Sequence, residues 1–398
     1  MRILGFDTSS LVTAIAVTDG DRVLAHDDRS SEQRHAEVLL PRIEAALASA
    51  QVGLSAIELI AVGIGPGSFT GLRVGLATAK GLALATKIPL CGVSSLRVLA
   101  RGVASRAEVV LAALDAGKHV LCEKPLANTV AEAEAMAAAA QRAQAHGAAA
   151  MAGFNYRRVP AIALARRLIA EGRLGQIHHF RGVYLNDRLV DPQAPRTWRH
   201  DRAQAGGGAV TDLGSHMIDL ARFLVGEMTE VAADLRTFIA ERPLPDGAGI
   251  APVDVDDAAT ALLRFAGGAM GTLEVSRFGT GHRNYNCFEL SGSAGSLAFN
   301  LERLNELSLF DRADRTLAGF RTLLVTERDH PYLAAWWPPG HTLGWEHTFI
   351  HAARDLIHGI ATGEPVSPDF EDGLRAQRVI DAIQRAALSR RWETVPET

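Results

Sequence analysis

Apolar and polar residues alternate in three short runs at the start of the chain. This period of two predicts β-strands at residues 2–6, 12–18 and 22–26. Asp19 and Gly20 form a hairpin-turn pair between the second and third runs, so these two strands are predicted to be antiparallel. Beyond the third run the apolar spacing predicts, in order, a helix, a strand, a helix and a strand at residues 33–50, 57–64, 68–86 and 88–93.

Three antiparallel strands followed by alternating helices and strands are typical of a ribonuclease-H-like domain, the half-unit of actin-like ATPases. The next stretch, residues 94–117, has leucine and valine at helical spacing and is interrupted at Gly102. We interpret it as a seam between two patterns. The second pattern is a helix, a strand, an alanine-rich helix and a strand at residues 107–116, 118–122, 130–146 and 148–154. This order is typical of the second half of a doubly wound nucleotide-binding domain.

Strand-like runs dominate the remainder of the chain. They lie at residues 177–185, 231–239, 258–265, 270–278, 286–291 and 296–300. Helical spacing is found at residues 161–171, 211–225 and 347–362. This pattern predicts an α+β domain in which helices cover one face of a large, mostly antiparallel sheet.

Composition narrows the class of protein. A content of 47% hydrophobic and 22% charged residues is that of an ordinary globular chain, and the net charge of −4 does not favour nucleic acid or membrane surfaces. Cys91, Cys122 and Cys287 are far apart and form no C-x-x-C pair, which argues against zinc and against a disulfide framework. No signal-peptide pattern and no apolar run of about 20 residues is present. We therefore expect a cytoplasmic protein without a metal site.

Two stretches carry candidate chemistry. The glycine-rich turn at residues 63–73 could hold an anion at a helix N-terminus, but a tight turn capped by Ser68 is the simpler interpretation. In a helix over residues 211–225, Asp212 and His216 share one face, which suits a histidine base for an alcohol proton with a carboxylate to orient its ring. Such a pair by itself is more often a surface or capping pair.

The first hundred residues resemble the TsaB family, whose members are non-catalytic subunits in threonylcarbamoyladenosine synthesis on transfer RNA. The similarity lies in DTSS at residues 7–10, RHAEVLLPRIEAAL at 34–47 and GPGSFTGLRVGLATAKGLALA at 65–85. It implies a face that pairs with a TsaD-like subunit. On this chain the implied partner residues are Leu39, Ile43, Arg73 and Leu76. ATP binding is not expected, because the second domain of that family is absent.

Residues 104–398 resemble the Gfo/Idh/MocA oxidoreductase family. The similarity lies in AALDAGKHVLCEKPLA at 112–127, GFNYRR at 153–158 and GGGAVTDLGSHMIDLARFLVGE at 206–227, and in two C-terminal segments at 336–357 and 368–383. It implies hydride transfer between a sugar or polyol hydroxyl and NAD or NADP, and homo-oligomers formed through the C-terminal sheet. The implied catalytic residues are Lys124, Asp212 and His216. We expect a cis bond before Pro125, which would place Lys124 in the cleft.

Further residues are weaker candidates. The resemblance implies that Glu123, Lys124, Pro125 and Asn155 contact the cofactor. Tyr156, Arg157 and Arg199 are candidate substrate contacts. For His341, in a tryptophan-rich stretch, a pocket position and plain packing are about equally supported.

The chain lacks one signature of that family. None of its G-x-G pairs is completed as G-x-G-x-x-G/A, since the required third place is taken by Ser68, Thr211, Pro252 or Asn284. We therefore expect an α/β plus α+β chain: a ribonuclease-H-like domain at residues 1–103, a truncated Rossmann half at 104–153 and an α+β substrate and oligomerisation domain at 154–398. Three functions follow: an oxidoreductase with impaired cofactor binding, a partner module for a TsaD-like subunit with the remainder as passenger, or a fusion with neither activity.

Overall fold

The structure is a computed structural model that describes residues 1–30, 35–95, 106–245, 247 and 249–396. Contacts between residues divide it into two compact units, Met1–Ser105 and Arg106–Thr398, each with its own hydrophobic core. The boundary expected at residues 103 and 104 lies outside the described residues, and the one expected at residue 153 stays a prediction. None of the helices in the described ranges is long and apolar enough to cross a membrane.

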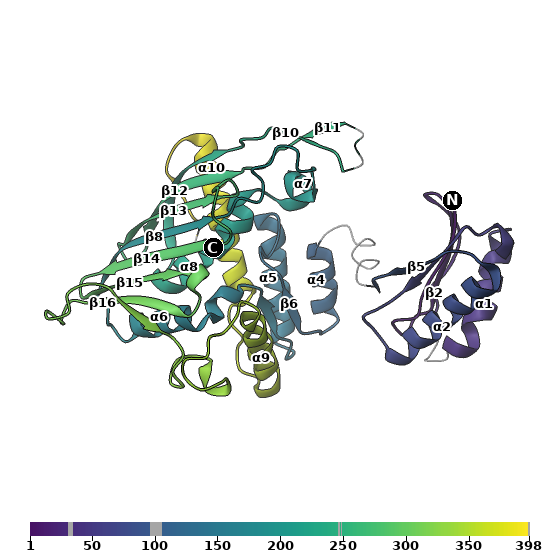
Figure 1. Cartoon of the computed structure of the whole chain (residues 1–398), viewed down its shortest axis with the longest axis horizontal. Helices are drawn as coiled ribbons and strands as arrows, with labels where there is room; N and C mark the ends of the chain where they lie inside the picture. The colour runs from purple at the N-terminus through teal and green to yellow at the C-terminus, as the bar shows by residue number, and fades with distance from the viewer. Residues whose placement is uncertain (31–34, 96–105, 246, 248, 397–398) are drawn as a thin grey trace. The chain divides into compact units, whose positions relative to one another are not determined.

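The first unit contains a five-stranded sheet of order β3-β2-β1-β4-β5 (Figure 1). Its strands are β1 Arg2–Asp7, β2 Ala14–Asp19, β3 Arg22–Asp27, β4 Leu59–Gly63 and β5 Leu90–Val93. The pairs β1–β2 and β2–β3 are antiparallel, whereas β1–β4 and β4–β5 are parallel. Helices α1 His35–Ser49 and α2 Phe69–Thr86 contact the sheet and each other. These elements lie within a few residues of the ranges predicted from apolar spacing.

Ser68 caps α2, because its side chain accepts a hydrogen bond from the N–H of Gly71. The glycines before it permit a close approach of two chain segments: a Cβ on Gly67 would lie 2.2 Å from the carbonyl oxygen of Ser9. The glycine-rich turn therefore has the capped, tightly packed form of the simpler interpretation.

The second unit begins with helices packed on two short parallel strands. In order these elements are α4 Arg106–Asp115, β6 Val120–Cys122, α5 Val130–Gln144 and β7 Ala150–Ala152. A capping box closes the start of α5, where Thr129 and Glu132 bind each other's backbone N–H groups. The long C-terminal helix α10, Phe370–Ser389, packs against α5 and contributes Phe370 and Leu374 to this core.

The main body is a nine-stranded sheet of order β17-β16-β15-β14-β8-β13-β12-β9-β18. Its strands are β8 Ile177–Leu185, β9 Met228–Arg236, β12 Ala258–Phe265, β13 Met270–Ser276, β14 Tyr285–Gly292, β15 Gly295–Asn300, β16 Glu306–Asp311, β17 Arg321–Leu324 and β18 Glu393–Thr394. Only β8 and β13 pair in parallel within it. Burial alternates along the strands because one face carries helices and the other does not.

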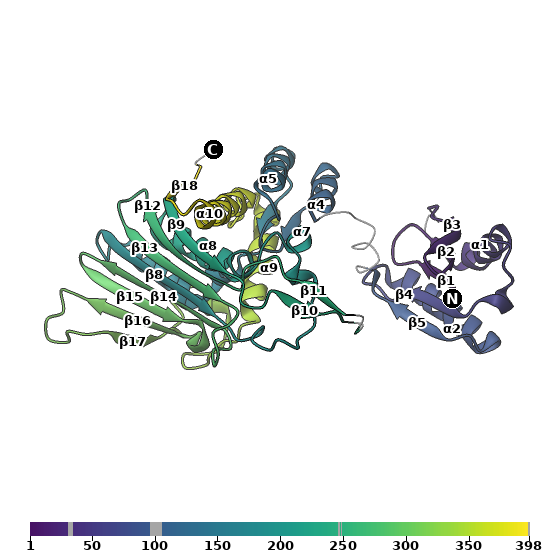
Figure 2. The ribbon, with the colours of Figure 1, turned by 90° about the horizontal axis from the view of Figure 1, so that it is seen from above.

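Helices α6 Pro160–Ala170, α8 Ser215–Val225 and α10 supply the apolar side chains that cover this face. Figure 2 shows α8 and α10 lying over the strands on the same side. The expected helix at residues 347–362 is α9, His347–Thr362, but it packs on residues 155–158 instead of covering the sheet. A small hairpin, β10 Glu241–Pro243 and β11 Ile250–Pro252, stands apart from the sheet.

Candidate active site

Lys124 lies two residues after the end of β6, and its peptide bond to Pro125 is cis, as expected. Its side chain is only 15% exposed. The ammonium nitrogen donates to the carbonyl oxygen of Asp212 at 2.8 Å and to Asp212 Oδ1 at 3.0 Å. The structure therefore brings together two residues that are 88 positions apart in the sequence.

Asp212 lies in a π-helical turn, Val210–Gly214, that leads into α8. The carboxylate of Asp256 holds the start of this turn by accepting from the N–H groups of Gly208 at 2.9 Å and Val210 at 2.8 Å. Its carbonyl oxygen also accepts from the N–H of Ala209. A Cβ on Gly208 would lie 1.8 Å from that carbonyl oxygen, so the glycine is required for the approach.

Arg277, just after β13, is the second cation at Asp212. Its Nη2 atom donates to Asp212 Oδ2 at 3.2 Å and to the carbonyl oxygen of Gly208 at 3.1 Å. Burial raises the pKa of the Asp212 carboxyl, but Lys124 and Arg277 outweigh it and hold the pKa below its usual range. Asp212 is therefore an ionised carboxylate shared between two cations.

His216, one turn further along, is buried and stacks on Tyr156 with ring centroids 4.3 Å apart. Its Nδ1 atom is buried and has no hydrogen-bond partner among the described residues. Burial lowers the pKa of His216, the charge on Lys124 lowers it further, and Asp212 opposes both. The ring is therefore neutral at neutral pH. Both oxygens of Asp212 accept from cations, and the expected orienting hydrogen bond from Asp212 to the ring is not found among the described residues.

A hydroxyl chain runs beside the histidine. Tyr156 and Tyr184 have their hydroxyl oxygens 3.0 Å apart, and the Tyr184 hydroxyl donates to Asn284 Oδ1 at 2.8 Å. Because Tyr184 uses its proton on Asn284, its oxygen accepts from Tyr156. The hydroxyl of Tyr156 is thereby held in the interior beside the His216 ring.

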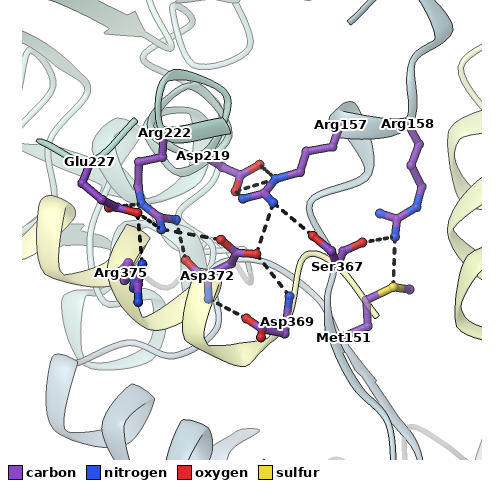
Figure 3. A network of polar contacts seen from close by, with 10 residues as sticks. All are labelled: Met151, Arg157, Arg158, Asp219, Arg222, Glu227, Ser367, Asp369, Asp372 and Arg375. Carbon is purple, nitrogen blue, oxygen red and sulfur yellow. Dashed lines mark hydrogen bonds and ion pairs between the residues drawn. The ribbon is translucent and has the colours of Figure 1, made fainter. Parts of the chain in front are cut away.

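Arg157, the neighbour of Tyr156, ties α8 to α10 through a buried ionic network (Figure 3). Its Nε atom donates to both oxygens of Asp219 at 3.0 and 3.1 Å, and its Nη1 atom donates to Asp372 at 3.1 Å. Asp372 also forms an ion pair with Arg222 of α8 at 3.5 Å. Two adjacent residues therefore contact α8: Tyr156 stacks on His216, and Arg157 pairs with Asp219 one turn further along. Arg157 is 8% exposed and engaged in this network, and its role as a substrate contact stays a prediction.

The remaining candidate residues lie away from the Lys124–Asp212 pair or are engaged elsewhere. Asn155 is buried and donates to Thr348 Oγ1 at 2.8 Å. Arg199 is exposed and stacks on the neighbouring Trp198, and His341 is exposed and contacts the carbonyl oxygen of Pro338. Glu123 is exposed, and its carbonyl oxygen accepts from Arg106.

In the first unit the expected partner residues divide into two groups. Leu39 and Ile43 are 1% and 2% exposed and lie in the core beneath the sheet, so they cannot form a docking face. This corrects the expectation, because in α1 these positions point inward. Leu76 is partly buried against the same core, and Arg73 is exposed and stacks on Phe69.

Sequence reasoning missed three residues of the site: Tyr184, Asp256 and Arg277. Arg277 and Tyr184 lie at or near the ends of strands β13 and β8, which are neighbours in the sheet. Asp256 and Arg277 left a signal that could have been used, since charged residues immediately flanking apolar strands are rarely buried without a partner. No group of three or more histidine, cysteine or acidic side chains within the described ranges is arranged to hold a metal.

Comparison with known proteins finds relatives that match most of the chain. A model of the GFO/IDH/MocA C-terminal domain matches residues 162–298. Levoglucosan dehydrogenase of Pseudarthrobacter phenanthrenivorans is 44% identical over 307 residues, which are 73% of this chain and 77% of that protein. A solved oxidoreductase domain protein from Kribbella flavida is 46% identical with a TM-score of 0.73, covering 85% of this chain and 90% of its own. A levoglucosan dehydrogenase solved with NADH and levoglucosan is 39% identical with a TM-score of 0.72, covering 86% and 90%.

A second, partial similarity is also present. TsaB of Escherichia coli is 39% identical over 118 residues, so the chain spans about half the length of that relative, 51%. A model of tRNA N6-adenosine threonylcarbamoyltransferase matches residues 27–183.

The solved structures correct the expected fold class. A ribonuclease-H-like domain joined to a truncated Rossmann half is wrong, because complete oxidoreductases, with a Rossmann domain and a sheet domain, align over 85–86% of the chain. Helices alternating with parallel strands occur in both architectures, so alternation along the sequence could not separate them. The identity to levoglucosan dehydrogenase extends over more than three quarters of that protein. The chain belongs to the Gfo/Idh/MocA oxidoreductase family.

Proposed function

We propose that the chain is an NAD(P)-dependent dehydrogenase that oxidises a CH–OH group of a sugar or polyol, levoglucosan being the first substrate to test. The observation that carries the proposal is that Lys124 binds Asp212, one helical turn before a buried, neutral His216. Similarity to levoglucosan dehydrogenase supports the substrate class.

The residues fit the reacting end of such a complex. Among the described residues, the buried Nδ1 of His216 lacks a partner, and Lys124 has two acceptors for three N–H groups. A bound nicotinamide would accept the hydride at C4. Lys124 would donate to the substrate oxygen, and neutral His216 would take the hydroxyl proton as the carbonyl forms. Asp212 would hold Lys124 in place.

The test is hydride transfer by the whole chain, followed by the absorbance of the reduced coenzyme with NAD or NADP and a panel of sugars and polyols. We expect turnover with at least one pair, and its loss in His216→Asn. The exposed Arg283→Met serves as the matched control, because the Arg283 side chain is 83% exposed and pairs with Asp187 instead of these residues. A folded chain that reduces neither coenzyme with any member of the panel would refute the proposal.

Coenzyme affinity is a separate expectation. Because the sequence has no completed G-x-G-x-x-G/A, we expect weaker binding than in levoglucosan dehydrogenase. Thermal unfolding with and without NADH measures it: saturation at 100 times the dissociation constant would stabilise the chain by about 2.7 kcal/mol. Affinity equal to that of levoglucosan dehydrogenase, measured side by side, would contradict this expectation.

A second candidate function rests on the similarity to TsaB. The first unit exposes Phe69 and Leu84 of α2, which are 75% and 85% exposed. Binding of the chain to a TsaD-like subunit, weakened by Arg73→Glu, would support a partner module.

We also expect homo-oligomers through the uncovered face of the large sheet, where Leu262 and Met270 are exposed. Light scattering of the purified chain tests that expectation.

A further inference from the structure

Arg277 is buried at the site and has a fixed set of partners. Its side chain is 5% exposed, and one nitrogen, Nη2, bridges the carbonyl oxygen of Gly208 and Asp212 Oδ2. The same guanidinium therefore holds both the backbone before the π-helical turn and the carboxylate within it. The second nitrogen, Nη1, is buried and has no hydrogen-bond partner among the described residues.

Lys124 and Arg277 divide the acceptors of Asp212 between them. Lys124 occupies the carbonyl oxygen and Oδ1, and Arg277 occupies Oδ2. An ammonium group has three N–H donors, so one donor of Lys124 has no acceptor among the described residues. If Oδ2 were released, the carboxylate could turn and accept that third N–H as well.

We propose that Arg277 is a positioning residue: by occupying Asp212 Oδ2, it keeps the third N–H of Lys124 available to the substrate oxygen. This inference rests on the proposed dehydrogenase function for its consequence, but not for the arrangement of the three side chains. Arg277 acts only through Asp212 and does not itself touch the substrate.

The charges around Asp212 support this division of roles. Among the described residues, Lys124, Arg277, His216 and Tyr184 interact electrostatically with it, from the end of β6, the end of β13, α8 and β8. Of these, only Lys124 and Arg277 carry positive charge at neutral pH, since the pKa of His216 is lowered by burial. Within the part of the chain that the structure describes, removing Arg277 therefore leaves Lys124 as the one cation bound to this carboxylate.

The decisive experiment measures the availability of Lys124 without turnover. The whole folded chain is acylated with acetic anhydride at fixed pH. Mass spectrometry then gives the rate of acylation at Lys124 relative to the rate at the exposed Lys118. In Arg277→Met we expect Lys124 to be acylated about fivefold more slowly, the effect of one additional hydrogen bond of ordinary strength. Arg277→Lys retains the charge but not the planar guanidinium, so its acylation rate at Lys124 should lie between those of Arg277→Met and the unmodified chain. The rate in Arg283→Met should match that of the unmodified chain.

A double-substitution cycle tests whether Arg277 acts through Asp212. In the Asp212→Asn background, Arg277→Met should no longer change the acylation of Lys124. An undiminished effect there, or unchanged acylation in Arg277→Met, would overturn the inference. If Arg277→Met does not fold, the comparison of Arg277→Lys with and without Asp212→Asn decides the same point.

Kinetics separates positioning from substrate binding. We expect Arg277→Met to lower kcat with little change in KM, because Arg277 acts on the donor to the reacting oxygen and not on substrate binding. A rise in KM at constant kcat would mean that Nη1 binds substrate directly and would overturn the inference. Absence of turnover in the unmodified chain would refute the dehydrogenase proposal, whereas the acylation result would still decide the role of Arg277.

Discussion

At the scale of single residues, the arrangement of the site is set by the hydrogen bonds that Lys124 and Arg277 donate to Asp212. Lys124, Asp212 and His216 were identified from the sequence, and the structure brings the first two into contact and places the third one turn away. The sequence hypothesis expected the Asp212 carboxylate to orient the His216 ring, but in the structure its partners are Lys124 and Arg277. Spacing along a helix places Asp212 and His216 on one face, but it carries no information about Lys124 and Arg277, which reach Asp212 from distant segments and take both of its oxygens.

In the proposed mechanism the ammonium group of Lys124 donates to the reacting oxygen, so its removal should affect the chemical step. We expect Lys124→Met to lower kcat by about 10²–10³-fold, comparable to the loss of one preorganised donor elsewhere. Steady-state kinetics measures this, with the exposed Lys118→Met as control. A kcat within twofold of the unmodified chain would show that Lys124 is not in contact with the substrate oxygen.

The buried His216 predicts how stability changes with pH. An unfolded histidine takes up its proton near pH 6.5, but burial lowers the pKa of His216 in the folded chain. The unfolded state therefore binds more protons just below that pH, and the free energy of unfolding should fall as the pH decreases from about 7.5 to about 5.5.

Urea midpoints at both pH values measure this, and the decrease should be smaller in His216→Asn. His200, His330 and His351 also have lowered pKa values because of burial, so part of the decrease should persist in that variant. An equal decrease with and without His216 would contradict the assignment to this residue.

At the scale of elements, α8 is fixed by ties that apolar spacing does not reveal. The predicted helix at residues 211–225 is a π-helical turn followed by α8, because Asp256 from a distant segment holds the N–H groups of residues 208 and 210. Periodicity locates the helix. Tertiary hydrogen bonds determine its first turn, so the irregularity beside the site could not be predicted from the local sequence.

The ion pair between Arg157 and Asp219 is a buried contact between α8 and the segment before α6. Their side chains are 8% and 2% exposed, so Arg157→Met would leave an uncompensated buried carboxylate. We expect a loss of about 3–5 kcal/mol in the free energy of unfolding, measured in urea.

The matched control is Arg264→Met, whose partner Glu230 and own side chain are 38% and 54% exposed. It should cost at most about 1 kcal/mol. Similar losses in the two variants would show that the network in Figure 3 does not stabilise α8.

At the scale of the whole molecule, each compact unit contains its own core. Residues such as Leu4 and Ile60 form the first, and those packed on the large sheet form the main core of the second. We expect two thermal transitions by calorimetry, because separate cores can unfold separately. Separate expression of residues 106–398 should reproduce one of them, and a single transition in the full chain would contradict the expectation.

The sequence predicted individual elements better than the fold class. Apolar spacing located most strands and helices within a few residues, and short motifs identified the oxidoreductase family. The missing G-x-G-x-x-G/A led to the expectation of a truncated nucleotide-binding half, and the alignment with complete oxidoreductases shows that this step was wrong. A motif reports a local turn, whereas the fold depends on pairings between strands that are distant in sequence.

Strand β6 offers one last consequence. Within the described ranges it has a single neighbour, β7, and its central residue Leu121 is 47% exposed. A strand with one open margin presents a ladder of unused N–H and C=O groups to any extended segment of suitable length. Because β6 ends two residues before Lys124, an extended segment that paired with this margin would lie close to that side chain.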